Sequence, residues 1–117
     1  MKFTNNTRVD FQGATIREIT IPQHITQFIV AAFYNTPLQS IILPAGMNAI
    51  ADRAFQLCRQ LTTVTILKPD GVVTLGVNVF DLATSLASIY VPADLVDSYK
   101  SASGWSNYAS KIKPIPQ

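Results

Sequence analysis

The chain is 117 residues long, 48% hydrophobic and only 14% charged, and its nine basic and seven acidic side chains leave a net charge of +2. This length suits one domain with a core of its own, and the scattered basic residues exclude the clustered positive charge of a nucleic-acid-binding surface. A single cysteine excludes a disulfide framework and a cysteine-based zinc site, and no apolar run is long enough to cross a membrane.

The first 15 residues are polar apart from a few apolar positions. Val9 and Phe11 alternate as in a strand, and together with Phe3 they predict a small hairpin that covers the part of the chain that follows. Because this cover is slight, we expect the N-terminal end to meet another chain. The segment also lacks the apolar run of a signal peptide. We therefore expect a chain that stays in the cytoplasm, or one from which an export signal has been removed.

A repeat begins at residue 16. Three repeats, 16–37, 38–60 and 61–85, precede a final strand with a closing segment, 86–117, and the third repeat is longer because residues are inserted near 68–73. One repeat cannot bury its own apolar side, but stacked repeats can, so the period predicts a solenoid in which the whole chain is one domain. The leading aliphatic residues are Ile16, Leu38, Leu61 and Leu86.

The first half of each repeat alternates as a strand does. Apolar residues stand three and five positions after the leading aliphatic, so their side chains are expected to point into the stack while their neighbours point out. Proline follows three of the four strands, at Pro22, Pro44 and Pro92, and ends them because it has no N–H to donate to a ladder. The inward pairs are Ile19 and Ile21, Ile41 and Leu43, Val64 and Ile66, and Ile89 and Val91.

The second half of each repeat returns the chain to the next strand by an irregular or helical path. Cys58 lies in one of these returns, three residues before the next leading residue, Leu61. We interpret it as a small buried hydrophobe, because a reactive thiol needs exposure and a nearby base or cation. Each return also carries a small or branched residue followed by a phenylalanine that should close the core, and in the third return both residues are expected to face it. These pairs are Ala32–Phe33, Ala54–Phe55 and Val79–Phe80.

The last 26 residues are predicted to close the final repeat. Pro92 and Asp94 suit the start of a helix, Gly104 suits its end, and a second short helix is expected from Ser106, followed by extended chain. Helical spacing of the aromatic residues favours a buried closing core over an exposed carbohydrate platform. The apolar residues of this closing segment are Leu95, Val96, Tyr99, Trp105, Tyr108 and Ile112.

One repeat carries a specific pattern, L-x-x-I-x-(I/V)-P followed by A-F-x-x-C-x-x-L, in Leu38, Ile41, Leu43, Pro44, Ala54, Phe55, Cys58 and Leu61. This pattern resembles the BspA-type leucine-rich repeat, and the resemblance runs from about residue 16 to the end of the chain. It implies an α/β solenoid of parallel strands with irregular or helical returns and a C-terminal helical cap. The first repeat departs from the pattern, with Thr36 in the place of Cys58, and the third lacks the proline.

The outward strand residues would form two rows on the sheet, mostly neutral and rich in hydroxyl groups. Ile42 and Tyr90 are candidate anchors for a partner, since tyrosine is favoured at interfaces. Hydroxylated β-formers are equally typical of a sheet that faces water. The candidate binding face consists of Glu18, Ser40, Thr63 and Ser88 in one row, and Thr20, Ile42, Thr65 and Tyr90 in the next.

The acidic residues are few and separated, and His24 is the sole histidine, so we expect no catalytic site, metal or cofactor. The resemblance implies an interaction module of the kind found in bacterial surface adhesins and bacteriophage structural proteins. We expect an accessory virion protein, made in the cytoplasm, that decorates a capsid or attaches a particle to a surface. Its partners would be its own copies, a capsid or tail protein, or a host-surface glycan or protein. The alternatives are a fragment of a secreted or cell-surface adhesin and, more remotely, a cysteine-dependent enzyme.

Overall fold

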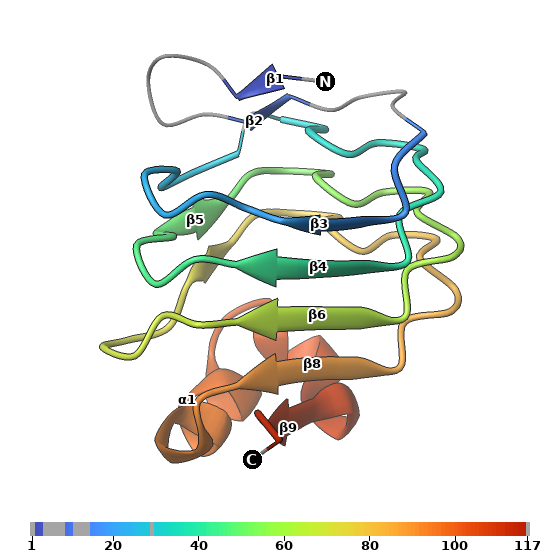
Figure 1. Ribbon diagram of the computed structural model, residues 1–117. Helices are drawn as coiled ribbons and strands as arrows, with labels where there is room; N and C mark the ends of the chain where they lie inside the picture. The colour runs from blue at the N-terminus through green and yellow to red at the C-terminus, as the bar shows by residue number, and fades with distance from the viewer. Residues whose placement is uncertain (1, 4–8, 11–14, 29, 117) are drawn as a thin grey trace.

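Five parallel strands form the main sheet of the protein (Figure 1). The computed structural model describes residues 2–3, 9–10, 15–28 and 30–116. Corresponding residues of successive repeats lie opposite one another, as when Ile19 pairs with Ile41 and Ile41 with Val64. The expected parallel stacking of the four strands is therefore confirmed. The strands are β3 (Glu18–Thr20), β4 (Ser40–Leu43), β6 (Thr63–Ile66), β8 (Ser88–Val91) and β9 (Ile112–Pro114), in this order across the sheet.

A second, two-stranded parallel sheet pairs the return segments. It contains β5 (Ala49–Ile50) and β7 (Thr74–Leu75), and a single bridge joins Gln27 of the first repeat to Ala49. The connection between β6 and β7, residues 67–73, is longer than the connection between β4 and β5, residues 44–48. The insertion expected in the third repeat is thus confirmed as a longer loop between two strands that keep their register.

The returns are irregular and contain no helix among the described residues between 15 and 92. Two residues with positive φ flank the phenylalanine of each return, for example Arg53 (57°) and Leu57 (63°) around Phe55. In an extended strand, neighbouring side chains would point to opposite faces. The left-handed residues break this alternation, and both members of the pairs at Phe33, Phe55 and Phe80 are buried. Of the two paths the sequence left open, the irregular one is correct.

Backbone hydrogen bonds link each return to the next. Phe33 N–H donates to the carbonyl of Ala54 at 2.8 Å, and Phe55 N–H donates to that of Val79 at 2.9 Å. Their rings follow the same order: Phe33 stacks on Phe55 with centroids 5.4 Å apart, and Phe55 on Phe80 at 5.5 Å. The core therefore contains a continuous column of stacked phenylalanines, one from each repeat.

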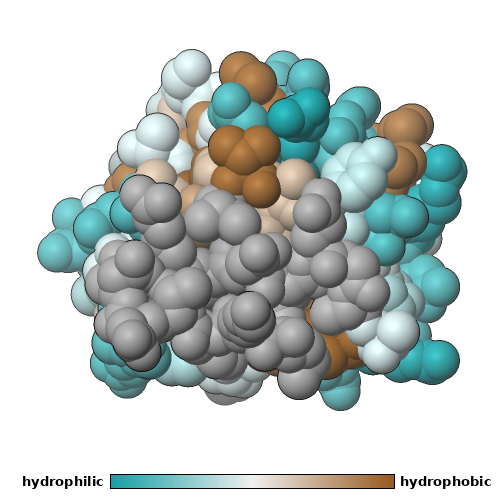
Figure 2. Space-filling model, turned by 90° about the horizontal axis from the view of Figure 1, so that it is seen from above, coloured by the Kyte–Doolittle hydropathy of each residue, from teal (hydrophilic) through white to brown (hydrophobic). Residues whose placement is uncertain are grey.

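Two short strands, β1 (Lys2–Phe3) and β2 (Val9–Asp10), form an antiparallel pair near the N-terminus. Figure 1 places this pair at the end of the array beyond β3. The expected small hairpin is confirmed at the level of the backbone. Phe11 and the side chains of Phe3 and Val9, on which the predicted cover depends, lie outside the described residues. Seen from this end, the described hydrophobic side chains form separate groups between hydrophilic ones (Figure 2).

The C-terminal segment continues from β8 through a 3-10 helix, η1 (Ala93–Leu95), the helix α1 (Val96–Ser101), a second 3-10 helix, η2 (Trp105–Lys111), and β9. The first expected helix is confirmed as α1, whereas the second consists of 3-10 turns that are interrupted at Tyr108, where φ is −116°. The predicted helix end at Gly104 is wrong: α1 ends at Ser101, and Gly104, with φ of 82°, precedes η2. The extended chain expected after η2 is also more than a tail, because β9 joins the main sheet beside β8.

Candidate functional site

The outer face of the main sheet carries the two rows of side chains that the sequence predicts. Their alignment follows from the strand register, which pairs Thr20 with Ile42, Ile42 with Thr65, and Thr65 with Tyr90. The sheet adds a residue that the sequence analysis missed, because Tyr90 pairs with Lys113 of β9. The row of Thr20, Ile42, Thr65 and Tyr90 therefore ends on a positive charge. A signal for this strand was present, since Ile112 follows Ile89 by about one repeat period.

A shallow hollow of about 310 Å³ opens at the β3 end of this face. Glu18, Ile19 and Thr20 line it from β3, and Ser40 and Ile42 line it from β4. Ile42 is 37% exposed, and Glu18 is exposed and forms no ion pair within the described part of the chain. The hollow thus combines an aliphatic side chain, hydroxyl groups and a free carboxylate.

Ser88 is the one residue of the predicted face that the structure removes from the surface. Only 8% of it is exposed, because the ammonium group of Lys113 donates to its hydroxyl at 2.9 Å and to the carbonyl of Ala87 at 3.5 Å. The prediction that Ser88 lies on the open face is therefore wrong. Thr63 and Thr65, in the middle of the face, are half-buried.

Cys58 is fully buried between the first and second repeats. Its thiol donates to the carbonyl of Phe33 at 3.0 Å and lies 3.5 Å from the hydroxyl of Thr36, which occupies the equivalent position one repeat earlier. Burial raises the pKa of the Cys58 thiol above its ordinary value, and the hydrogen bonds with Thr36 oppose this in part. The interpretation of Cys58 as a packing residue is confirmed by its burial.

Tyr99 and Trp105 join the C-terminal segment to the third repeat. The hydroxyl of Tyr99 accepts the N–H of Val73 at 3.0 Å, and the indole N–H of Trp105 donates to the carbonyl of the same residue at 2.7 Å. Both aromatic side chains are fully buried, so the carbohydrate-platform alternative is wrong for them. Tyr108 is half-buried and packs edge-on against Phe80 with a centroid distance of 5.2 Å.

Residues 7–110 match the family of the BspA type leucine rich repeat region (6 copies). The chain belongs to this family. A search of curated proteins and a search of solved structures each find no match. The BspA-type match and the parallel sheet with few helices are consistent with a solenoid-like repeat fold and indicate a protein-interaction or adhesion-like module.

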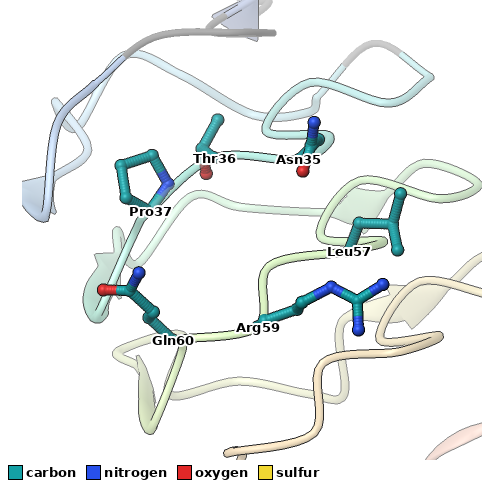
Figure 3. A pocket seen from close by; sticks show the side chains of 6 residues that line it. All are labelled: Asn35, Thr36, Pro37, Leu57, Arg59 and Gln60. Carbon is teal, nitrogen blue, oxygen red and sulfur yellow. The ribbon is translucent and has the colours of Figure 1, made fainter.

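A second hollow, of about 230 Å³, lies at a corner between the first two BspA-type repeats (Figure 3). It lies where the second repeat has one residue more than the first before the next strand; the Gln60 side chain extends toward Pro37, whereas that of Arg59 points away from it (Figure 3). The remaining lining residues are Asn35, Thr36 and Leu57.

Within the described ranges, no three histidine, cysteine or acidic residues gather as a metal site would require. Nor does any helix there have the length and apolarity needed to traverse a bilayer.

Proposed function

We propose that this chain is a non-enzymatic interaction module that binds a protein partner through the outer face of its main sheet. The observation that carries the proposal is the exposed Ile42 in a hollow that also holds the carboxylate of Glu18, which forms no ion pair with any residue that the structure describes. An aliphatic anchor next to a single charge suits a partner that inserts an apolar side chain and presents a basic group. Membership of a family of interaction and adhesion-like repeats supports the same function.

The partner would extend along the row from Ile42 to Tyr90. Tyr90 is half-exposed two strands away, and Thr65 between them offers a hydroxyl for hydrogen bonding. Lys113 follows Tyr90 in the register, so the row has a carboxylate near one end and an ammonium group at the other. This arrangement would fix the direction in which a partner lies, because charge complementarity contributes more to specificity than to affinity.

We further propose that the repeats form a short solenoid that the C-terminal segment closes. Stacked repeats leave an apolar end that needs a cover. The phenylalanine column ends at Phe80, and Trp105 and Tyr108 both pack against its ring. The two hydrogen bonds of Val73, one donated to the buried Tyr99 and one accepted from the buried Trp105, support the same role for this segment.

An absence of catalysis is part of the proposal. Cys58 is buried and the pKa of its thiol is raised, whereas a nucleophilic cysteine requires access and a lowered pKa. The thiol is also engaged with the carbonyl of Phe33. Its environment therefore supports a packing role over the cysteine-dependent enzyme that the sequence left as an alternative.

The setting that we propose is a bacteriophage particle, on which the chain would act as an accessory protein that decorates the capsid or attaches the particle to a surface. The alternative setting is a bacterial cell-surface adhesin. Both are consistent with an interaction module of this repeat family. They differ in the partner, which is a capsid or tail protein in the first setting and a cell-surface protein or glycan in the second.

Site-specific photo-crosslinking tests the binding face. A photoreactive phenylalanine derivative in place of Tyr90 should capture one protein partner in the native host. The same derivative in place of Val77, which is 64% exposed in a return segment, serves as the matched control. Equal capture from both positions, or none from position 90, would contradict the proposed face. Recovery of the crosslinked product with purified particles supports the virion setting, and recovery with the cell envelope supports the adhesin.

A further inference from the structure

The strand β9 is the last strand of the main sheet, and the backbone groups on its free edge differ from those of an ordinary edge strand. An exposed edge presents unpaired N–H and C=O groups and is a template for pairing with another strand. In a parallel ladder each residue directs both groups to the same neighbour, and successive residues alternate between the two sides. One hydrogen bond therefore determines to which side the backbone N–H and C=O groups of each residue of β9 point.

That bond is between Ile115 and β8, since the N–H of Ile115 donates to the carbonyl of Val91 at 2.9 Å. Lys113, two residues earlier, faces β8 as well, in agreement with its pairing with Tyr90. The backbone groups of positions 112, 114 and 116 consequently point away from β8, to the free edge.

None of these three positions offers a free N–H. Positions 114 and 116 are proline, which has no N–H, and the N–H of Ile112 donates to the carbonyl of Ala109 at the end of η2. The free edge from Ile112 to Pro116 thus presents acceptors without donors. An incoming strand would leave its own carbonyl groups without partners against the proline rings.

We infer that Pro114 and Pro116 close the sheet at β9 against the addition of a strand from a second copy of this chain. Both prolines are exposed, so their rings add little to the core and their position on the free edge is the feature that matters. The inference concerns the edge of the sheet and goes beyond the proposed binding on its face. Copies of the chain are thereby kept from joining edge to edge into longer sheets.

Sedimentation velocity over a range of protein concentrations tests this inference with the double variant Pro114→Thr/Pro116→Thr, which restores two N–H donors to the free edge. We expect the double variant to form dimers or larger species at concentrations at which the wild-type distribution is constant. Amide hydrogen exchange at positions 114 and 116 should slow at least tenfold as the concentration rises. Pro69→Thr, an exposed proline in the loop 67–73, is the matched control and should sediment as the wild type does.

Two results would overturn the inference. One is a folded double variant, as judged by circular dichroism, that sediments as the wild type does at every concentration. The other is an equal increase in size for Pro69→Thr. If the double variant does not fold, the single variant Pro116→Thr decides, because this exposed residue follows β9 and restores one donor to the same edge.

Discussion

The hydrogen bond between Tyr99 and Val73 can be removed without disturbing the packing around it. Replacing Tyr99 by phenylalanine keeps the ring, which lies edge-on to Trp105 with centroids 5.1 Å apart, and deletes only the oxygen that accepts the Val73 N–H at 3.0 Å. Both Tyr99 and Val73 are fully buried, so water does not replace the lost acceptor. An unsatisfied buried N–H costs about 1–3 kcal/mol, and we expect the free energy of unfolding to fall by this amount.

Urea denaturation followed by tryptophan fluorescence measures the effect. Trp105 is the only tryptophan and is fully buried, so its emission reports the exposure of the C-terminal segment. The matched control is Tyr108→Phe, because the hydroxyl of Tyr108 has no hydrogen-bond partner among the residues that the structure describes, and its ring packs on Phe80. An equal loss of stability in the two variants, with unchanged m-values, would refute the reasoning.

The pH dependence of the free energy of unfolding, compared between the wild type and Tyr99→Phe, provides a second test. Burial raises the pKa of Tyr99 above its usual value of 10.0, against the opposing hydrogen bond from Val73. The native state therefore keeps a proton that the unfolded chain releases, so the stabilisation is fully present below pH 10 and is lost as the pH rises above it. Phenylalanine does not ionise, so the stability difference between wild type and Tyr99→Phe should narrow above that pH. A difference that stays constant there would contradict the pKa direction.

Three further predictions concern the repeats. Gly76→Ala should lower the free energy of unfolding by about 1–3 kcal/mol, because the added Cβ would stand 2.5 Å from Oδ1 and 2.7 Å from the backbone nitrogen of Asp52. The control is Gly71→Ala, whose Cβ would have no atom within 4 Å and which should be close to neutral in the same urea assay. Leu82 has φ of 60°, so thermal unfolding should rank Leu82→Asn at least as stable as the wild type and Leu82→Val clearly less stable; the opposite order would contradict the left-handed conformation. Iodoacetamide should modify Cys58, monitored by mass spectrometry, no faster than the protein unfolds, and rapid modification of the native protein would revive the catalytic alternative.

The stacking of the repeats could be predicted from the sequence because each repeat must bury apolar side chains at the same positions against its neighbours. Aliphatic residues at fixed positions after Ile16, Leu38 and Leu61 place the strands in register, and the same spacing locates Cys58 in the core. The insertion in the third repeat was visible for the same reason, as a local excess of residues between positions that otherwise repeat. Strand alternation predicted the two rows of the outer face, apart from the burial of Ser88 and the addition of Lys113.

The tertiary structure alone decided the contacts between the repeats and the C-terminal segment, which is not itself a repeat. The burial of Ser88 depends on Lys113, 25 residues away in β9, and the role of Val73 depends on Tyr99 and Trp105 in the C-terminal segment. No repeat period relates Val73 to Tyr99 and Trp105, and the spacing that indicates β9 beside β8 does not show that the Lys113 side chain bonds to Ser88. Likewise, the left-handed backbone at residues such as Leu57 could not be recognised from the sequence, because these positions are not glycine. The hydrogen bonds between neighbouring returns impose this backbone conformation on ordinary residues. The sequence by itself thus determined the repeating frame, and long-range contacts decided how the frame is ended and which of its surface residues remain exposed.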